Sequence, residues 1–267
     1  MKVYCNGKFV DKGTVEEILE PGFLFGWGVF ETIRAYNKRI AFLNMHIERL
    51  KRDVSFLGLS LSFIDFKQVI EQLLEKNGLN DAYIRITVYK KRESTGIVIY
   101  VSEFTYYGEE SYERGAEVVF SPYRRLSSDP FLRIKSISYI KSRLSWLYAQ
   151  IHQKDEAIFL NENDVVQEGS RSNIFFVKKK EVFTPSVKCG ILKGITRDVV
   201  IDLCRKKKIR INEGEFSVQD LMEADEIFLT SSLMEIMPVS QIADKDFNMR
   251  RCVITGMLRQ EYKKIIA

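Results

Sequence analysis

The hydrophobic positions of the first 105 residues repeat with two periods, one typical of strands and one typical of helices. Ile47, Leu50, Val54 and Leu57 fall on one face of a helix that we expect to begin with Asn44 as its N-cap. An Asn-Gly pair between two short apolar runs predicts a hairpin at the start of the chain. The expected elements of this half are a hairpin over 3–10, strands over 29–36, 82–89 and 97–104, and helices over 44–57 and 64–76.

The pattern breaks between residues 121 and 130, where two prolines and several polar residues interrupt any period. We interpret this segment as the connector between a smaller N-terminal α/β domain, residues 1–120, and a larger C-terminal domain, residues 131–267. The expected elements of the second half are helices over 138–153, 197–208 and 251–265, and strands over 156–160, 172–177 and 226–230. The sequence therefore predicts an α+β protein of two domains.

Composition narrows the classes of function. The chain of 267 residues is 45% hydrophobic, which is enough for a substantial core. Its net charge of +5 is mild, and the lysine runs at 178–180 and 206–208 lack the interleaved aromatic residues of a nucleic-acid platform. No run reaches membrane-spanning length, and four scattered cysteines with two histidines do not suit a zinc site. We therefore expect a cytoplasmic protein with no metal, nucleic-acid or membrane partner.

One lysine stands in a segment that invites a chemical interpretation. Lys135 lies in the string Ile134-Lys135-Ser136-Ile137-Ser138-Tyr139, directly after the expected connector. A lysine on a rigid element that excludes bulk water has a lowered pKa and becomes a nucleophile. In a chain rich in lysine a solvated surface position is the simpler interpretation, so other motifs have to support the chemical one.

Those motifs follow in a fixed order along the chain: Gln167-Glu168-Gly169-Ser170-Arg171-Ser172-Asn173, then Gly194-Ile195-Thr196-Arg197-Asp198, then a Thr-Ser-Ser run at 230–232. From Phe30 to Val239 the chain resembles the class IV aminotransferases, also called fold type IV enzymes. This family includes branched-chain aminotransferase, D-amino acid aminotransferase and aminodeoxychorismate lyase. The resemblance implies a two-domain α+β fold, pyridoxal 5′-phosphate in the cleft between the domains, and a homodimer with its active sites near the subunit interface.

The resemblance assigns a role to each residue of the cofactor's reactive side. Lys135 would carry the cofactor as a Schiff base. Tyr139 matches a tyrosine that contacts the cofactor's phenolic oxygen in branched-chain aminotransferases, although it would serve equally in the core. Ser138 departs from the asparagine that is common there. Glu168 matches the glutamate that meets the pyridine nitrogen, where a carboxylate keeps the ring protonated and a good electron sink; a simple turn is the alternative.

The cofactor's phosphate needs fixed donors. Ile195 and Thr196 precede a predicted helix, whose free N–H groups and dipole suit a dianion. By resemblance the donors are the amides of these two residues, the hydroxyls of Thr196 and Ser232, and the guanidinium of Arg49 in the string His46-Ile47-Glu48-Arg49-Leu50. Taken alone, Thr196 would be a helix N-cap and Arg49 a helix-surface residue.

The substrate is less well specified. Phe30 and the Tyr83-x-Arg85 pair resemble pocket residues of branched-chain aminotransferases, with backbone amides near Ser232 and Leu233 for the carboxylate. Alternatively, Tyr83 and Arg85 lie on a solvent-facing side of a strand. D-amino acid enzymes use an Arg-x-His in the following loop, and residues 90–96 contain no histidine, although Arg92 could serve. The string 233–239 looks more like aminodeoxychorismate lyase.

We therefore expect amino transfer from a branched-chain or other hydrophobic L-amino acid to a 2-oxo acid, 2-oxoglutarate above all, by a ping-pong mechanism. A D-amino acid donor ranks second and aminodeoxychorismate lyase third. The alternative from another class is a basic binding protein without catalysis, for instance on RNA, which would be colourless and would bind its partner in a salt-sensitive manner.

Overall fold

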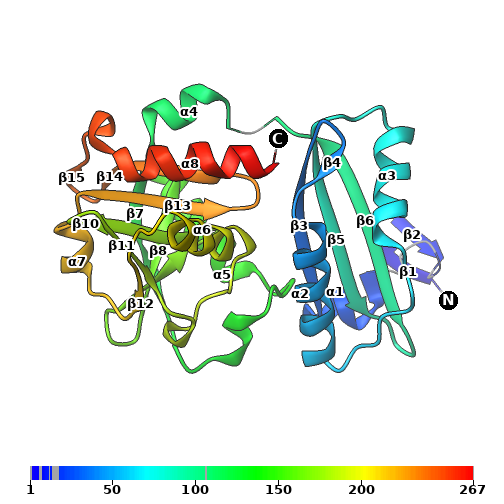
Figure 1. Ribbon diagram of the computed structural model, residues 1–267. Coiled ribbons are helices and arrows are strands. Elements are labelled where there is room, and N and C mark those ends of the chain that lie inside the picture. Colours follow the sequence, from blue (N-terminus) through cyan, green and yellow to red (C-terminus); the bar gives the residue numbers. More distant parts are fainter. Residues whose placement is uncertain (1, 6–7, 12, 14–17, 106, 267) are drawn as a thin grey trace.

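The computed structural model describes residues 2–5, 8–11, 13, 18–105 and 107–266, with the backbone alone for the first two ranges. The chain forms two lobes, each built on its own sheet (Figure 1). Strands β1 (Lys2–Cys5) and β2 (Lys8–Asp11) form a separate antiparallel pair. The two strands of the predicted hairpin are confirmed, and its Asn-Gly turn lies outside the described residues.

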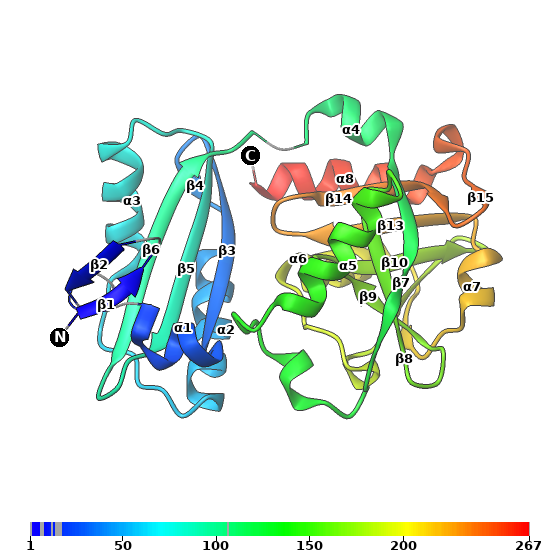
Figure 2. The ribbon, with the colours of Figure 1, turned by 180° about the vertical axis from the view of Figure 1, so that it is seen from behind.

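The smaller lobe is an antiparallel sheet of four strands with two helices on one face (Figures 1 and 2). Along β5 the side chains of Ile84, Ile86 and Val88 are fully buried beneath these helices, whereas Tyr83 and Arg85 alternate onto the opposite face. The elements are α1 (Pro21–Phe25), β3 (Gly28–Tyr36), β4 (Arg39–Ile40), α2 (Leu43–Phe56), α3 (Phe66–Lys76), β5 (Ala82–Lys90) and β6 (Thr95–Glu103).

The predicted N-cap of helix α2, Asn44, is wrong by two residues. The helix begins at Leu43, and the capping position is Phe42, which adopts a left-handed φ of 51° and offers no side-chain cap. Packing decides this start, because the Phe42 ring lies 5.8 Å from that of Tyr262 in the last helix. Asn44 is exposed in the first turn. The predicted apolar face is confirmed, with Leu50 and Val54 buried in the core of the lobe.

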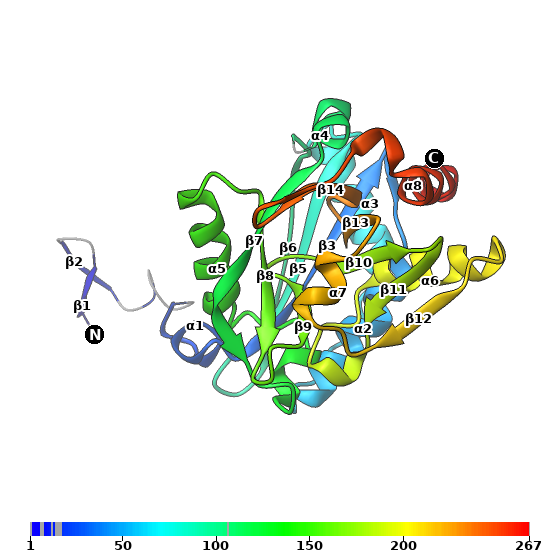
Figure 3. The same ribbon diagram turned by 90° about the vertical axis from the view of Figure 1, so that its left-hand side faces the viewer.

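The larger lobe is a mixed sheet of nine strands in the order β12-β11-β10-β13-β14-β7-β8-β9, with β15 paired to β14. The sheet curls until β9 approaches β10, and its two faces carry separate hydrophobic clusters, one of them beneath α6 and α8 (Figure 3). The strands are β7 (Ala116–Arg125), β8 (Glu156–Asn161), β9 (Val166–Gly169), β10 (Asn173–Lys178), β11 (Glu181–Pro185), β12 (Ile211–Gly214), β13 (Glu226–Ser231), β14 (Glu235–Ile242) and β15 (Lys245–Asp246). The helices are α4 (Glu109–Arg114), α5 (Ile140–Ile151), α6 (Ile195–Lys206), α7 (Val218–Met222) and α8 (Val253–Ile266), with short 3₁₀ turns at Pro130–Arg133, Val187–Cys189 and Met249–Arg251.

The expected connector over 121–130 needs a correction in its first half. Residues up to Arg125 continue strand β7, which pairs with β8 in parallel and skips register between Phe120 and Arg124. Pro122 falls in this irregularity, because a proline has no N–H for a regular ladder. The chain passes between the two sheets after Glu103 and before Ala116. The division into domains stays a prediction, and we now place its boundary within 104–115.

Contacts across the lobes fix the segment that contains Lys135. Val29 of β3 pairs with Ser136 in an isolated antiparallel bridge. Phe30 N–H donates to the Lys135 carbonyl at 2.8 Å, and Ile137 N–H donates to the Gly28 carbonyl at 3.0 Å. The lysine segment therefore behaves as an additional short strand at the edge of the smaller sheet. In the part of the chain that the structure describes, no helix has the length and apolar character to cross a bilayer.

Candidate active site

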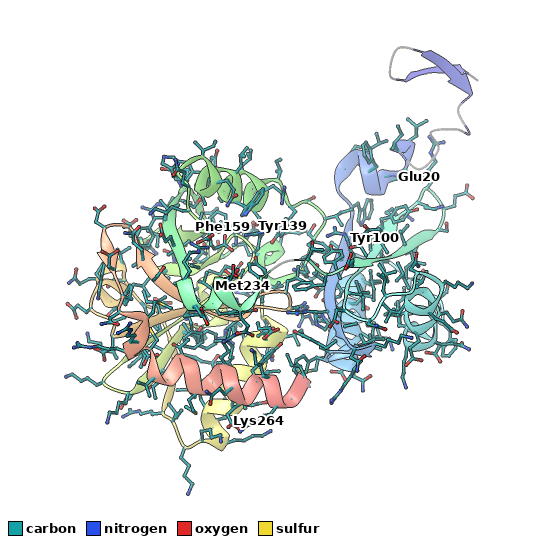
Figure 4. All side chains as sticks on the ribbon, turned by 90° about the horizontal axis from the view of Figure 1, so that it is seen from above. Glu20, Tyr100, Tyr139, Phe159, Met234 and Lys264 are labelled. Atoms are coloured by element: carbon teal, nitrogen blue, oxygen red, sulfur yellow. The ribbon has the colours of Figure 1, made fainter. Side chains whose placement is uncertain are left out.

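A cavity of about 840 Å³ lies where the two lobes meet. Viewed from above, Tyr139 lies on the side of the larger lobe that faces the smaller lobe, where Tyr100 lies (Figure 4). Residues distant in the sequence line this cavity, from α2, the lysine segment, β9, the start of α6 and the end of β13. The lining includes all seven residues predicted to bind the cofactor: Arg49, Lys135, Tyr139, Glu168, Ile195, Thr196 and Ser232.

Lys135 extends into the cavity from its short strand. Its ammonium nitrogen lies 4.5 Å from the ring centre of Phe30 and 6.0 Å from that of Tyr139. Burial, followed by the nearby charge of Arg49, lowers its pKa to about 8, although the carboxylates of Glu31 and Glu168 act in the opposite sense. A pKa near neutrality gives this lysine a larger neutral, nucleophilic fraction than a solvated lysine has.

A buried carboxylate on α2 holds the backbone of this lysine. Asp53 is 1% exposed, and its Oδ2 accepts a hydrogen bond from Lys135 N–H at 2.9 Å. Its Oδ1 accepts from the Nη2 of Arg52 at 2.8 Å. With the bridge to Val29, this contact ties the lysine to two elements of the smaller lobe, so its side chain has a fixed origin.

Glu168 faces the same cavity from β9 and is held by donors on three sides. Its Oε1 accepts from Arg125 Nη1 at 2.8 Å, and its Oε2 accepts from Leu192 N–H at 3.0 Å and from Asn173 Nδ2 at 3.1 Å. Burial nevertheless raises its pKa to about 7, against the lowering effect of Arg125 and of these hydrogen bonds. One further cation would stabilise the charged form of a carboxyl group with this pKa. A protonated ring nitrogen in the cavity would supply that cation.

Arg49 reaches the cavity from α2 through a bidentate ion pair. Its Nε and Nη2 donate to the two oxygens of Glu31 at 2.7 and 2.6 Å, and His46 Nδ1 lies 2.7 Å from the same carboxylate. Burial by itself raises the pKa of Glu31, but the guanidinium and imidazole outweigh it and hold the value at about 2. The third nitrogen, Nη1, donates to the Lys193 carbonyl at 3.1 Å, which places the cation beside the start of α6.

The start of α6 is built as an anion site. Gly194 is its N-cap residue and no side chain caps the helix, so the first amide groups remain available. A side chain at Gly194 is excluded, because a Cβ there would lie 2.0 Å from Asn173 Oδ1. Among the described residues the buried hydroxyl of Thr230 has no hydrogen-bond partner, and the buried hydroxyl of Thr196 lies beside that of Tyr262. An orphaned hydroxyl beside free amides fits a phosphate.

Two further predicted residues have their hydroxyls partly engaged. The Tyr139 O–H donates to the Ser170 carbonyl at 2.8 Å, and burial, then the charge of Glu168, raises its pKa to about 12. Ser232 Oγ lies 3.4 Å from His46 Nε2. Ser138, where the family has asparagine, donates to the Gly26 carbonyl at 3.1 Å and so secures the neighbouring turn.

The four predicted substrate residues lie outside the set that lines the cavity. Phe30 comes nearest, between Lys135 and the guanidinium of Arg85, which stacks on its ring at 3.8 Å. Arg85 Nε also donates to Thr87 at 3.2 Å, and the Tyr83 ring packs against that of Tyr100 at 6.2 Å. Tyr83 and Arg85 are half-buried, so the alternative of a fully solvated strand face does not hold.

Sequence reasoning missed five residues of this site: Glu31, Asp53, Arg125, Asn173 and Thr230. Asn173 and Thr230 stood inside quoted motifs without a role, and Glu31 lay in a predicted strand without one. Arg125 was assigned to an irregular connector, so nothing suggested that its buried guanidinium would meet Glu168 and stack on Phe159 at 3.4 Å. Asp53 could have been found from the helical period, because positions 46, 49 and 53 share one face of α2.

Known proteins resemble the chain over nearly all of its length. Residues 28–242 match the family model described as amino-transferase class IV. A Methanocaldococcus jannaschii protein with the provisional name branched-chain-amino-acid aminotransferase is 35% identical over 99% of this chain and 96% of its own length. The aminodeoxychorismate lyase of Bacillus subtilis is 29% identical over 99% of this chain and 94% of its own.

A further relative and a solved structure match at similar identity. The D-alanine aminotransferase of Bacillus licheniformis is 30% identical over 91% of this chain and 88% of its own length. Among solved structures, the branched-chain aminotransferase of Thermoproteus uzoniensis with norvaline superposes with a TM-score of 0.87 at 30% identity, over 100% of this chain and 94% of that one.

Proposed function

We propose that this chain, which belongs to the class IV aminotransferases and is therefore a pyridoxal-phosphate-dependent enzyme, transfers amino groups from branched-chain or other hydrophobic L-amino acids to 2-oxoglutarate. The observation that carries the proposal is one cavity that brings together a lysine with a pKa of about 8, a glutamate that lacks one cation, and an anion site. These three features match the aldehyde, the ring nitrogen and the phosphate of that cofactor.

Different residues would hold the phosphate and the ring nitrogen of the cofactor. The start of α6, the hydroxyls of Thr196, Thr230 and Ser232, and Arg49 would hold the phosphate. Glu168, supported by Arg125 and Asn173, would pair with the ring nitrogen. When bound, the cofactor supplies an electron sink for the bond that breaks at the substrate Cα.

Lys135 would anchor the cofactor and then act as the proton carrier. Its neutral amine would take the proton from the substrate Cα and deliver it to the cofactor C4′. Because its backbone is held by Asp53 and by the bridge at Ser136, we expect the nitrogen to approach the substrate from one face. Tyr139 would orient the phenolic oxygen side of the ring from its bond to Ser170.

Donor selection is argued from the residues beside Lys135. Phe30 is buried beside Lys135, and Arg85 and Tyr83 stand behind it on the same sheet face, which suits an apolar side chain near the lysine. The carboxylate would meet backbone amides near Ser232 and Leu233. The loop between β5 and β6 contains no histidine, which counts against the Arg-x-His arrangement of D-amino acid enzymes. D-amino acid transfer and lyase activity stay second and third, since relatives of both kinds match the chain.

The assembly we propose is a homodimer, in the cytoplasm. Helix α5 directly follows the lysine segment, and its apolar residues Ile140, Leu144, Leu147 and Ile151 are between 40% and 69% exposed along one stripe. A contiguous apolar stripe at this spacing suits a helix that packs against a second subunit.

Lys135→Ala tests the cofactor assignment. We expect the yellow colour of the lysine-bound cofactor to be lost and turnover to fall by about a thousandfold or more, because one amine performs both tasks. Borohydride reduction of the wild-type protein followed by peptide mapping should label Lys135. A label on another lysine would overturn the assignment, and Lys206→Ala, at an exposed position outside the cavity lining, is the control.

Matched L and D donors test the substrate. Rapid-mixing spectra should show faster loss of the lysine-bound cofactor band with L-leucine, L-isoleucine or L-valine than with D-alanine or D-glutamate. A faster D series would mean that Arg92 or Arg85 binds the carboxylate, and the L-donor proposal would be withdrawn while the cofactor chemistry stood. Pyruvate release from aminodeoxychorismate would instead identify a lyase.

A further inference from the structure

Glu235 holds a backbone conformation that residues with side chains rarely adopt. It is the first residue of β14, its φ is +53°, and it is 4% exposed. Glycine is the usual residue at such an angle, since any Cβ is strained there. A glutamate persists in this position only where its side chain is held by contacts that outweigh the strain.

Those contacts lie in the other lobe. Glu235 Oε1 accepts from Arg34 Nη1 at 2.7 Å and from the Tyr36 hydroxyl at 2.9 Å, and both partners belong to β3. The Arg34 guanidinium is itself fixed between the rings of Tyr36 and Phe104, at 4.2 and 3.7 Å. Burial and the charge of Glu235 raise the pKa of Tyr36 well above its usual value, so its hydroxyl stays a donor.

Glu235 also closes the turn that borders the active-site cavity. It pairs with Ser231 across the β13–β14 hairpin, and residues 232–234 form the turn between them. Ser231 and Ser232 line the cavity, and Ser232 approaches His46, which is bound to Glu31 of β3 at 2.7 Å. One strand of the smaller lobe therefore holds this turn at both of its ends.

We propose that Glu235 is a positioning residue that fixes the 231–234 turn at the distance from β3 at which its backbone amides bind the substrate carboxylate. The inference rests on the proposed function, which places that carboxylate near Ser232 and Leu233. Glu235 itself touches no reacting atom, so its loss should weaken substrate binding far more than it slows the chemical step.

The surroundings of the second Glu235 oxygen allow two substitutions with different expected effects. A cavity of about 290 Å³ lies behind the turn, and Oε2 has no hydrogen-bond partner among the described residues. Only one acceptor oxygen is engaged, so Glu235→Gln keeps the tether through its carbonyl with the amide turned to the cavity. Glu235→Gly removes the tether and at the same time relieves the backbone strain.

The experiment measures KM for the amino donor and the Kd of 4-methylpentanoate, an unreactive carboxylate, by spectral titration of the cofactor-loaded enzyme. We expect Glu235→Gly and Arg34→Met each to raise both constants about tenfold with kcat within about threefold, and the double variant to be no worse than either alone. Glu235→Gln should stay within about threefold of wild type. Lys178→Met, which breaks an exposed pair with Glu223 on the same lobe, is the matched control and should change neither constant.

Unchanged KM and Kd in Glu235→Gly, or additive losses in the double variant, would overturn the inference and leave Glu235 as a structural strut. If Glu235→Gly does not fold, Tyr36→Phe removes one donor from the opposite side and should raise both constants about threefold; no change there would overturn the inference as well. Loaded wild-type enzyme that binds neither donor nor carboxylate would overturn the proposed function together with it.

Discussion

Two buried glutamates on opposite sides of the cavity have pKa values on opposite sides of the ordinary one. Glu31 is completely buried and has a pKa of about 2, because the Arg49 guanidinium donates to both of its oxygens and His46 Nδ1 lies 2.7 Å from one of them. Glu168 is also buried, but Arg125 is its one bonded cation and its pKa is about 7. Burial acts in the same direction on both, so the difference comes from the partners: Arg49 donates to both oxygens of Glu31, whereas Arg125 donates to one oxygen of Glu168.

This difference separates a structural cluster whose charges are paired within the protein from a binding site that leaves groups for a ligand. The cluster around Glu31 is satisfied within the protein and orients Arg49 toward the start of α6. Another cation on the cavity side would stabilise the charged carboxylate of Glu168. Free hydroxyls and amides also line that cavity. The charged groups of the scaffold are therefore paired within the protein, whereas polar groups of the cavity are left for a ligand to pair with.

Glu31→Gln should produce the largest effect. It leaves the Arg49 guanidinium buried without its counter-charge, and we expect a loss of about 3–5 kcal/mol in the free energy of unfolding. Urea unfolding of the cofactor-free protein at neutral pH measures it. Glu48→Gln, on the exposed face of the same helix, is the control and should stay within about 0.5 kcal/mol. A loss below about 1 kcal/mol for Glu31→Gln would contradict the comparison.

Glu168→Gln should behave in the opposite way. Stability of the cofactor-free protein should be unchanged or higher, since an under-compensated charge is removed. Turnover should fall by two to three decades, about 2–4 kcal/mol at the transition state, because the ring nitrogen loses its anionic partner. Steady-state kinetics of the loaded variant test this, with cofactor content measured alongside. Turnover within threefold of wild type would remove Glu168 from the site.

The pH dependence of stability should mirror the two pKa values. The folded-state pKa of Glu31 is lowered, so its stabilisation is full above pH 4.5 and is lost as pH falls toward 2. That of Glu168 is raised, so its stabilisation is full below pH 4.5 and is lost as pH rises through 7. The stability difference between each glutamine variant and wild type should change in its own window, by about 3 kcal/mol at most. Urea midpoints at closely spaced pH values measure these differences, and a shared window would refute the assignment.

Thr230→Val should give the smallest change. Valine keeps the shape of threonine and removes a buried hydroxyl that has no partner among the described residues, so stability of the cofactor-free protein should not fall. Affinity for pyridoxal phosphate should drop about 5–30-fold, or about 1–2 kcal/mol, while affinity for pyridoxal, which lacks the phosphate, stays the same. Equal losses for both ligands would show that Thr230 does not face the phosphate.

Periodicity and capping preferences were sufficient to predict an element wherever its own sequence pattern determines its structure. The apolar face of α2, the alternation along β5 and the helix after Gly194 follow from periods and capping preferences, and they appear nearly at the predicted positions. The errors lie where packing overrides such rules. Phe42 rather than Asn44 begins α2 because its ring packs on a helix more than 200 residues away in the chain, and β7 continues through Pro122 because a register shift accommodates it.

The sequence by itself determined the family and the cofactor, and it supplied the candidate site residues that stand in contiguous motifs, since spacing along the chain identifies such strings without any fold. The tertiary structure alone decided how their charges combine. Whether a guanidinium donates to one oxygen of a buried glutamate or to both, whether Glu235 reaches Arg34 across 201 positions, and which hydroxyls are left without partners all depend on contacts between distant segments. A pKa or an unsatisfied donor is a property of the surrounding space, and residue order does not contain it.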